Sequence, residues 1–400
     1  MKFSSLTRRI VADTPRGTAP IDPWAVHNLA MQRTARGDAI TMLSIGQESE
    51  ERTPEIVVDA AIASLRSGRH HYVDVRGEKH LRQAVAEYHA RLTTQSVTAE
   101  SVTIFTGAQN ALFSVAQVLL DIDDELILVA PYYTTYAATF GAPGPAVVIV
   151  QVEAEDGYQL NVDRLLDAVT PRTQAIVLNT PNNPLGSHYT QAQIERIVQV
   201  CLAKDIWLIL DAVYLDTVEA GSVALPHLIP DSERILVTVG SLSKSHRMTG
   251  WRVGWVIGPA TVAAHLAKLC VCMHYGIPPF IQDAAVVAIH QATGTPETVR
   301  SVMQHRRSLL LEHLTTVEPA RLIDAGQGMF ILLDVEPLGM TAFEFAMGLL
   351  EERKVSVLPC DGFGPGGRYL VRIGLCVDGQ MLSDAGRKIC QFIAENKRTD

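Results

Sequence analysis

The residues that could most clearly take part in a reaction lie in SLSKSHRMTGWRVGW, residues 241–255, directly after the apolar run ILVTVG. Lys244 occupies a turn at the carboxyl end of this expected buried strand, where open α/β sheets place their ligands. Loss of solvation lowers the pKa of a lysine and makes its amine a nucleophile toward aldehydes. Ser241, Ser243 and Arg252 supply hydroxyls and a guanidinium, which are groups that hold a phosphate. The alternative is that Lys244 is a solvated loop lysine.

Three further segments carry polar groups at the ends of apolar runs. TGAQNAL, residues 106–112, opens an expected helix, whose first backbone N–H groups could hold an anion. NTPNNPLG, residues 179–186, ends a run in an Asn/Pro turn, which is also ordinary turn chemistry. Asp211 ends the all-apolar run IWLILDA, where an ionised carboxylate is costly without a cationic partner, and Tyr214 follows it.

Short apolar runs alternate with stretches of helix length through the middle of the chain. Nearly continuous apolar runs are typical of strands that are buried on both faces of a mainly parallel sheet. Thr190 and Gln193 have the spacing of a capping box and predict a helix start between two of the runs. The chain is therefore predicted to contain a large α/β unit with strands at 102–106, 125–130, 146–152, 174–179, 206–212, 235–240 and 254–258.

After about residue 285 the pattern changes to a helix (296–318), a strand (328–335), a helix (341–353), two short apolar runs and a terminal helix from about 380. This order predicts a smaller α+β unit. We therefore expect a large α/β domain over residues 46–285 and a small α+β domain over 286–400. Residues 1–45 are expected to form an N-terminal arm and part of the small domain.

Composition excludes several classes of function. The chain has 400 residues and a formal net charge of −9, so an acidic surface argues against nucleic acid as a partner. No stretch approaches 18 uninterrupted apolar residues, and the N-terminal residues lack the apolar core of a secretory signal. These features predict a cytoplasmic protein without a membrane contact. The six cysteines show no metal-ligand spacing, so no metal is expected.

The order of the motifs resembles the class I/II aminotransferases, pyridoxal phosphate (PLP) enzymes of fold type I. The resemblance spans almost the whole chain and rests on TGAQ, PYYTTY, NTPNNPLG, DAVY, SLSK, GWRVG and VRIGL. It implies a fold type I PLP-dependent transferase, with pyridoxal 5′-phosphate as cofactor and amino acids and 2-oxo acids as small-molecule substrates. It also implies a homodimer.

The resemblance assigns the PLP contacts position by position. Lys244 is expected to bind PLP covalently and to move the substrate proton, and Asp211 to keep the pyridine nitrogen protonated. Asn183 and Tyr214 are expected at the phenolic oxygen, and Tyr133 on the ring face. The phosphate is expected to be held by Gly107, Ala108, Gln109, Ser241, Ser243 and Arg252.

The resemblance also assigns the substrate contacts and a dimer contact. Arg372, in YLVRIGLC, is expected to take the α-carboxylate as a bidentate pair, beside Gly46 and Asn183. Tyr72, five residues before Gly77, is expected to reach the phosphate of the neighbouring subunit. The active sites would then be shared across the dimer.

Three segments, HYVDVRGEKHLR, SLSKSHRMTGWRVGW and YGIPPFIQDAA, are similar to a bacterial branch of the family that transfers the amino group of arginine to pyruvate. A guanidinium is best compensated by carboxylates. Glu48, in the loop after Gly46, and Asp74, near Tyr72, are the candidates for this contact, whereas Glu50 is expected to be solvated. The bland alternative makes Glu48 and Asp74 solvated surface carboxylates as well.

Two departures from the family pattern leave the PLP contacts intact. Leu185 stands where threonine is common, and Ala212 where glutamate is common.

Three alternatives remain open at this stage. The donor could be an aromatic or aliphatic amino acid, the reaction could be that of a PLP lyase or oxidase, or the chain could be a PLP-binding domain of a regulator.

Overall fold

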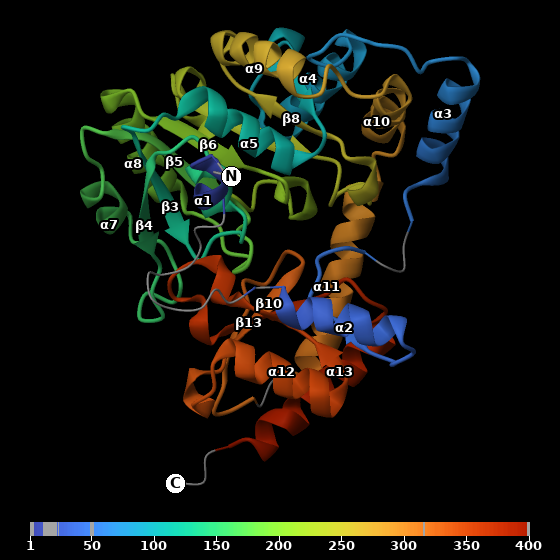
Figure 1. The fold of residues 1–400 in the computed structure, drawn as a ribbon, viewed down its shortest axis with the longest axis vertical. Coiled ribbons are helices and arrows are strands. Elements are labelled where there is room, and N and C mark those ends of the chain that lie inside the picture. The colour runs from blue at the N-terminus through green and yellow to red at the C-terminus, as the bar shows by residue number, and fades with distance from the viewer. Residues whose placement is uncertain (1–3, 11–21, 23, 49–51, 315–316, 398–400) are drawn as a thin grey trace.

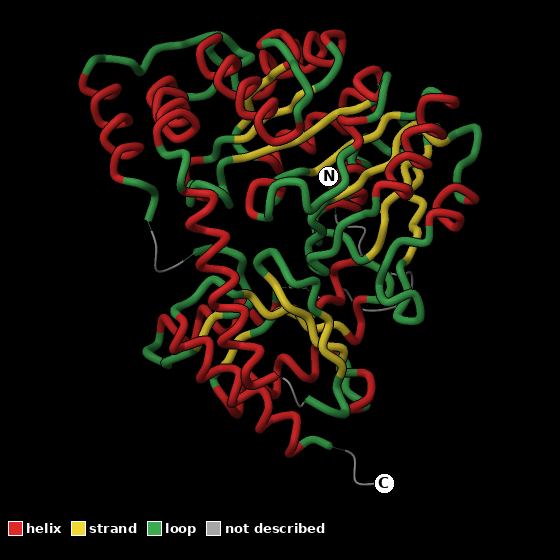
Figure 2. The backbone as a smooth tube through the Cα atoms, turned by 180° about the vertical axis from the view of Figure 1, so that it is seen from behind, coloured by secondary structure: helices red, strands yellow, loops and turns green. Residues whose placement is uncertain are grey.

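The computed structural model describes residues 4–10, 22, 24–48, 52–314 and 317–397 (Figure 1). The chain forms a large unit around a seven-stranded sheet and a smaller unit around a four-stranded one, as Figure 2 shows from behind. The long helix α11 (Thr295–Leu314) runs from the large unit into the smaller one (Figure 1). This arrangement is the predicted α/β class with a second α+β unit.

The large sheet has the strand order β2-β8-β7-β6-β5-β3-β4. Five consecutive strands of the sheet are parallel to one another, in the order β7, β6, β5, β3 and β4. Strand β8 is antiparallel to both β2 and β7. The strands are β2 (Val102–Phe105), β3 (Glu125–Ala130), β4 (Ala146–Gln151), β5 (Thr173–Asn179), β6 (Trp207–Asp211), β7 (Leu236–Ser241) and β8 (Gly254–Ile257). Each lies within two residues of its predicted run.

One of these strands differs from the prediction of burial on both faces. β4 lies at an edge of the sheet and is mostly exposed or half-buried, with Ala146 and Ile149 exposed. An edge strand has a neighbour on one side only, so apolar β-branched residues there form a strand without being fully buried.

Helices surround the large sheet within the large unit (Figure 1). They are α3 (Glu55–Arg66), α4 (Lys79–Thr93), α5 (Ala108–Leu119), α6 (Tyr136–Gly141), α7 (Val162–Asp167), α8 (Gln191–Lys204), α9 (Ala260–Met273) and α10 (Pro279–Gln291). The predicted capping box at α8 is confirmed, because the Thr190 side chain accepts from the Gln193 backbone and the Gln193 side chain accepts from the Thr190 backbone. These two bonds satisfy backbone donors that the first turn of a helix leaves free.

The smaller unit has an antiparallel sheet in the order β12-β13-β10-β9 and a separate parallel pair, β1 with β11. These strands are β1 (Thr41–Met42), β9 (Arg321–Ile323), β10 (Phe330–Asp334), β11 (Val355–Ser356), β12 (Leu358–Pro359) and β13 (Leu370–Gly374). Besides α11, its helices are α2 (Ala25–Ala35), α12 (Ala342–Arg353) and α13 (Gly379–Glu395).

The predicted N-terminal arm contacts both units. Val26 and Leu43 belong to the same apolar cluster as Phe345 and Phe392 of the smaller unit. The short helix α1 (Leu6–Arg9) instead lies at the large unit, where Arg9 Nε donates to the Ala142 carbonyl at 2.8 Å. The domain boundaries at residues 45 and 285 stay a prediction.

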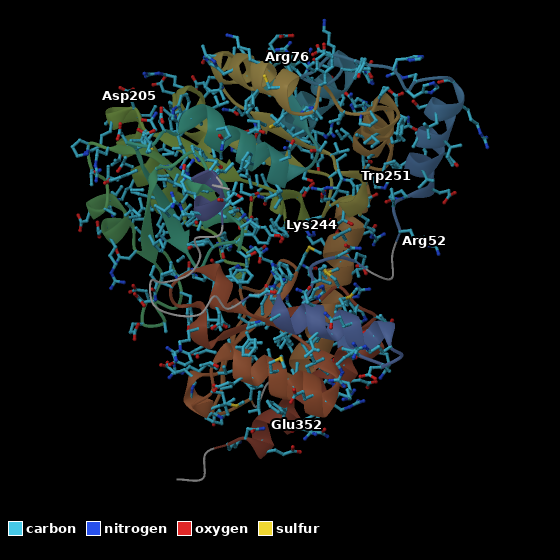
Figure 3. All side chains as sticks on the ribbon, viewed as in Figure 1. Arg52, Arg76, Asp205, Lys244, Trp251 and Glu352 are labelled. Carbon is cyan, nitrogen blue, oxygen red and sulfur yellow. The ribbon has the colours of Figure 1, made fainter. Side chains whose placement is uncertain are left out.

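The fold brings the chemically interesting residues to one edge of the large sheet. Because β5, β6 and β7 are parallel, their carboxyl ends meet there, and Asn179 and Asp211 are register partners. Lys244 follows β7 and lies at the junction with the smaller unit (Figure 3). Among the helices of the described ranges, none is long and apolar enough to cross a membrane.

Candidate active site

A cavity of about 410 Å³ lies at this edge, between the two units. Most of the predicted site residues line it: Gly46, Ala108, Gln109, Tyr133, Asn183, Asp211, Tyr214, Ser241, Ser243, Lys244, Arg252 and Arg372. Trp24, Tyr136 and Phe330 also line the cavity, and none of the three was predicted. The cavity is large enough for a small cofactor together with an amino acid.

Lys244 reaches the cavity from the turn after β7. Its Nζ donates to the Gly46 carbonyl at 2.7 Å, so the amine is held against the loop that follows β1. Burial lowers the pKa of the Lys244 amine, and the nearby guanidinium groups of Arg372 and Arg252 act in the same direction. A lysine with a lowered pKa carries more of the uncharged, nucleophilic amine at neutral pH.

Asp211 ends β6 with only 4% of its surface exposed. Its carboxylate accepts hydrogen bonds from the Tyr136 hydroxyl and from the Val213 backbone N–H, the latter at 3.2 Å. These neutral donors do not cancel the cost of burial, which raises the pKa of Asp211 to about 6. A cationic partner in the cavity would remove that cost.

Several groups converge where the first turn of α5 meets the Lys244 turn. Gly107 is the N-cap of α5 and has φ +87°, and a Cβ there would lie 2.1 Å from Nη2 of Arg252. Arg252 itself has φ +58° and donates to the Thr249 carbonyl at 2.8 Å. The Ser241 and Ser243 hydroxyls lie 2.8 Å apart. A helix N-terminus, two hydroxyls and a guanidinium together fit a phosphate.

Gln109 lies beside this group, but its side chain is engaged within the protein. Its amide nitrogen donates to Thr139 at 2.7 Å and its amide oxygen accepts from Thr135 at 2.8 Å. A contact between Gln109 and a phosphate would therefore come from its backbone N–H. The side chain instead ties α5 to α6.

Arg372 lies on β13 of the smaller unit and is 2% exposed. It donates to Asn183 Oδ1 at 2.9 Å and to the Ser44 carbonyl at 3.0 Å, and its guanidinium carbon lies 4.1 Å from the ring centre of Phe330. Burial lowers the pKa of this guanidinium. The Asn183 amide in turn donates to the Tyr214 hydroxyl at 3.3 Å. A carboxylate bound here would meet a rigidly held cation.

Phe330 explains a second requirement of the site. A Cβ at Gly46 would lie 2.6 Å from the Phe330 ring, so only glycine leaves room for the ring to cover Arg372. Sequence patterns could not single out Phe330, because it sits in an ordinary apolar strand. Tyr136 is different: it belongs to the motif PYYTTY, three residues after Tyr133, and this spacing was a usable signal.

Four predicted residues lie outside the cavity lining of the single chain. Gly107 belongs to the group of residues at the start of α5 that fits a phosphate. Tyr72 is 86% exposed, and its ring packs edge-on against Tyr275. Glu48 forms an ion pair with Arg306 at 2.7 Å, and Asp74 lies 3.5 Å from Arg82. Glu50 falls outside the described residues.

Residues 39–389 match the family described as aminotransferase class I and II. An arginine–pyruvate transaminase of Pseudomonas aeruginosa is 42% identical over 99% of both chains. An aspartate/prephenate aminotransferase of Thermus thermophilus is 30% identical over 97% of this chain and 98% of its own length.

Solved structures give the same result. Aspartate aminotransferase from Thermus thermophilus with maleate superposes with a TM-score of 0.90 at 28% identity, and covers 98% of this chain and 100% of the neighbour. An aromatic aminotransferase from Pyrococcus horikoshii gives 0.85 at 26% identity over 92% and 99% of the two chains. The chain belongs to the class I and II aminotransferases, enzymes of fold type I that use pyridoxal 5′-phosphate.

Proposed function

We propose that this aminotransferase moves the α-amino group of arginine, or of another basic amino acid, to a 2-oxo acid such as pyruvate. The observation that carries the proposal is the 42% identity with an arginine–pyruvate transaminase over 99% of both chains. The proposal also places the enzyme in the cytoplasm and makes it a homodimer with shared active sites.

The cavity suits PLP at both ends. When bound, PLP supplies an aldehyde that accepts an amine and a ring that stores the electrons released at the substrate Cα. Asp211 would face the pyridine nitrogen, which is the cation that its burial calls for. Tyr214 and Asn183 would contact the phenolic oxygen, and Tyr133 the ring face. The phosphate would lie at Gly107, Ala108, Gln109, Ser241, Ser243 and Arg252.

Two side chains would act on the substrate. Arg372 would bind the α-carboxylate with the donor groups of its guanidinium that face the cavity, and Asn183 would orient it. Lys244 would attach the cofactor in the resting enzyme and, once displaced by the donor, would take the proton from the substrate Cα at Nζ. Its lowered pKa keeps Nζ able to accept that proton at neutral pH.

Recognition of a basic side chain needs a partner beyond the cavity lining. Of the described residues that line the cavity, only Asp211 carries a carboxylate, and the proposal assigns Asp211 to the cofactor. Trp24 and Tyr133 offer aromatic faces, on which a guanidinium can stack. The carboxylate would come from Asp74 of the partner subunit, near the exposed Tyr72. Glu48 could serve only if its ion pair with Arg306 opened.

The test is a panel of amino acids, each mixed with the PLP-loaded enzyme in a single half-reaction that yields the pyridoxamine form. Arginine is expected to exceed norleucine by about tenfold or more in kcat/KM, because a buried charge contact contributes more than 1.4 kcal/mol. Asp74→Asn should raise KM for arginine and leave norleucine unchanged. Glu48→Gln should affect both donors alike, because it disturbs the Arg306 pair.

Equal rates for arginine and norleucine would overturn the donor assignment. A keto acid product without amino transfer to added pyruvate would overturn the reaction. Asp163, an exposed carboxylate outside the cavity lining, provides the matched control, since Asp163→Asn should change neither donor.

A further inference from the structure

A buried polar cluster lies directly behind the lysine in the chain. Ser245 and His246, the two residues after Lys244, are 0% and 1% exposed. The Ser245 hydroxyl lies 2.9 Å from His246 Nδ1 and hydrogen-bonds also to Asp216 and to Tyr88. The Tyr88 hydroxyl donates to Asp216. We call Tyr88, Asp216, Ser245 and His246 the serine cluster.

The serine cluster joins four elements around the site. Tyr88 belongs to α4, Asp216 to the short 3₁₀ helix Leu215–Thr217 after β6, and Ser245 to the turn after β7. The His246 ring hydrogen-bonds to the backbone of Ala288 in α10, and this bond raises the pKa of the ring, which identifies the ring N–H as the donor. Asp216 stands two residues after Tyr214, and Ser245 one residue after Lys244. The cluster therefore connects the chain segments that carry these two predicted PLP contacts.

Donors and acceptors fix part of the direction of the cluster. The Tyr88 hydroxyl donates to Asp216. The ring N–H of His246 is used on Ala288, so the second ring nitrogen is left to accept from the Ser245 hydroxyl.

Burial acts on both titratable members of the cluster. It raises the pKa of Asp216 to about 6, and it lowers the pKa of His246 to about 4, so the ring is neutral at pH 7 and Asp216 takes up a proton more readily than an ordinary aspartate. With that proton bound, Asp216 accepts from Tyr88 and donates to Ser245, while Ser245 donates to His246. The cluster is then a directed chain of hydrogen bonds that ends at α10.

We infer that Asp216 is a positioning residue that acts through Ser245 on the turn carrying Lys244. The turn is tight, because the His246 N–H donates to the Leu242 carbonyl at 3.2 Å and Arg247 has φ +56°. The hydrogen bonds of the Ser245 side chain fix this turn next to the lysine, and Asp216 is one of the partners in these bonds. The inference rests on the proposed role of Lys244.

Two variants of Asp216 separate positioning from simple packing. Asp216→Asn keeps the chain, since its amide oxygen accepts from Tyr88 and its NH₂ group donates to Ser245. Asp216→Ala breaks the chain at the same position. Tyr88→Phe removes one donor and retains the ring, and its matched control is Tyr158→Phe, whose hydroxyl lies 3.5 Å from Asp334 and outside the cavity lining.

The first measurement uses the cofactor-free protein. The pKa of the Lys244 amine is obtained from its rate of amine labelling against pH, read by mass spectrometry of the Lys244 peptide. The second measures kcat and KM of the half-reaction. Asp216→Ala and Tyr88→Phe should shift the labelling profile of Lys244 and lower kcat by about ten- to a hundredfold with KM little changed, as expected for a misplaced reacting group. Asp216→Asn and Tyr158→Phe should match the unaltered enzyme.

The inference is wrong if Asp216→Ala leaves kcat and the labelling profile unchanged, or if Asp216→Asn is as impaired as Asp216→Ala. Should Asp216→Ala fail to fold, Tyr88→Phe decides by the same two readouts. Borohydride reduction of the PLP-loaded enzyme and peptide mapping test the role of Lys244 separately. A label on another lysine would refute that role, while the labelling profiles would still report on the serine cluster.

Discussion

The charged forms of Lys244 and Asp211 have opposite signs, and burial disfavours the charged form of each. It lowers the pKa of the amine and raises the pKa of the carboxyl to about 6, so each group is driven toward its neutral form. They are not partners of each other, since Lys244 donates to the Gly46 carbonyl and Asp211 accepts from Tyr136 and Val213. A ligand with an amine-reactive carbon and a protonated ring nitrogen satisfies both.

Replacing Lys244 tests the first of these roles. Lys244→Ala should still fold and still bind PLP through the phosphate contacts, because these come from other residues. It should lose turnover and the pH-sensitive visible absorption of the lysine-linked cofactor. Absorption spectra and half-reaction rates give the answer, and normal transamination by the variant would refute the assignment.

Asp211 should make the cofactor-free protein less stable at high pH. An unfolded aspartate has a pKa of about 3.9 and the folded one about 6, so between these values the folded state binds more protons. Stability therefore falls as the pH rises through this range and stays lower above it. Asp211→Asn should remove this loss, and be more stable than the unaltered protein at pH 8, by on the order of 3 kcal/mol, but not at pH 4.

Urea unfolding of the cofactor-free proteins at the two pH values measures this difference. Asp163→Asn, at an exposed site, is the control and should show none. Added PLP should reverse the order at pH 8, because the carboxylate then gains its cation. An Asp211→Asn variant that is less stable at pH 8 without PLP would contradict the pKa argument.

At the scale of the elements, apolar runs located every strand of the large sheet, because parallel strands under helices are apolar along their whole length. The same rule could not show that β4 is exposed or that β8 runs antiparallel, because both depend on neighbours distant in the sequence. The predicted helix at 296–318 is described as far as Leu314, and residues 317 and 318 are not helical. Local patterns fix the element type, and tertiary contacts fix its ends and its partners.

The same division applies to the cavity. Residues in motifs next to strand ends, such as Asp211 and Lys244, were found because the end of a parallel strand is a defined place. Phe330 and Trp24 reach the cavity only through the packing of the smaller unit, and no local pattern marks them. Arg372 was assigned by resemblance alone, and the structure adds its contacts with Ser44 and Phe330.

The start of α5 gives a prediction at this scale. Gly107→Ala would place a Cβ 2.1 Å from Nη2 of Arg252, at a backbone φ of +87° that alanine rarely adopts. The guanidinium must then move from the helix N-terminus, so we expect PLP affinity to fall by about tenfold or more, as for a lost charge-assisted hydrogen bond. Gly250→Ala is the control, since a Cβ there meets nothing within 4 Å.

Equilibrium dialysis or fluorescence titration of the cofactor-free proteins measures the two affinities. Equal dissociation constants for Gly107→Ala and Gly250→Ala would mean that Arg252 does not hold the phosphate in this position.

At the scale of the whole molecule, the single chain leaves several large apolar side chains exposed. Tyr72 is 86% and Tyr275 53% exposed, and their rings pack edge-on at 5.2 Å. On α3, which lies at the outside of the large unit in Figure 1, Ile62 and Leu65 are 40% and 44% exposed. Exposed apolar groups of this kind are typical of a surface that a partner covers, which supports the proposed homodimer.

Subunit mixing tests whether the dimer shares its sites. If Tyr72 serves the neighbouring cavity, a heterodimer of Tyr72→Ala and Lys244→Ala has one site with both residues intact and one site with both replaced. Random exchange makes half of the dimers mixed, and half of their sites are intact, so we expect about a quarter of full activity from two impaired proteins.

Lys244→Ala mixed with Asp211→Asn is the matched control. Those two residues line the same cavity of one chain, so every mixed site keeps one defect and no activity should return. Recovery in both mixtures would point to a contaminant, and recovery in neither, after exchange is verified by mass spectrometry, would show that Tyr72 does not act across the dimer.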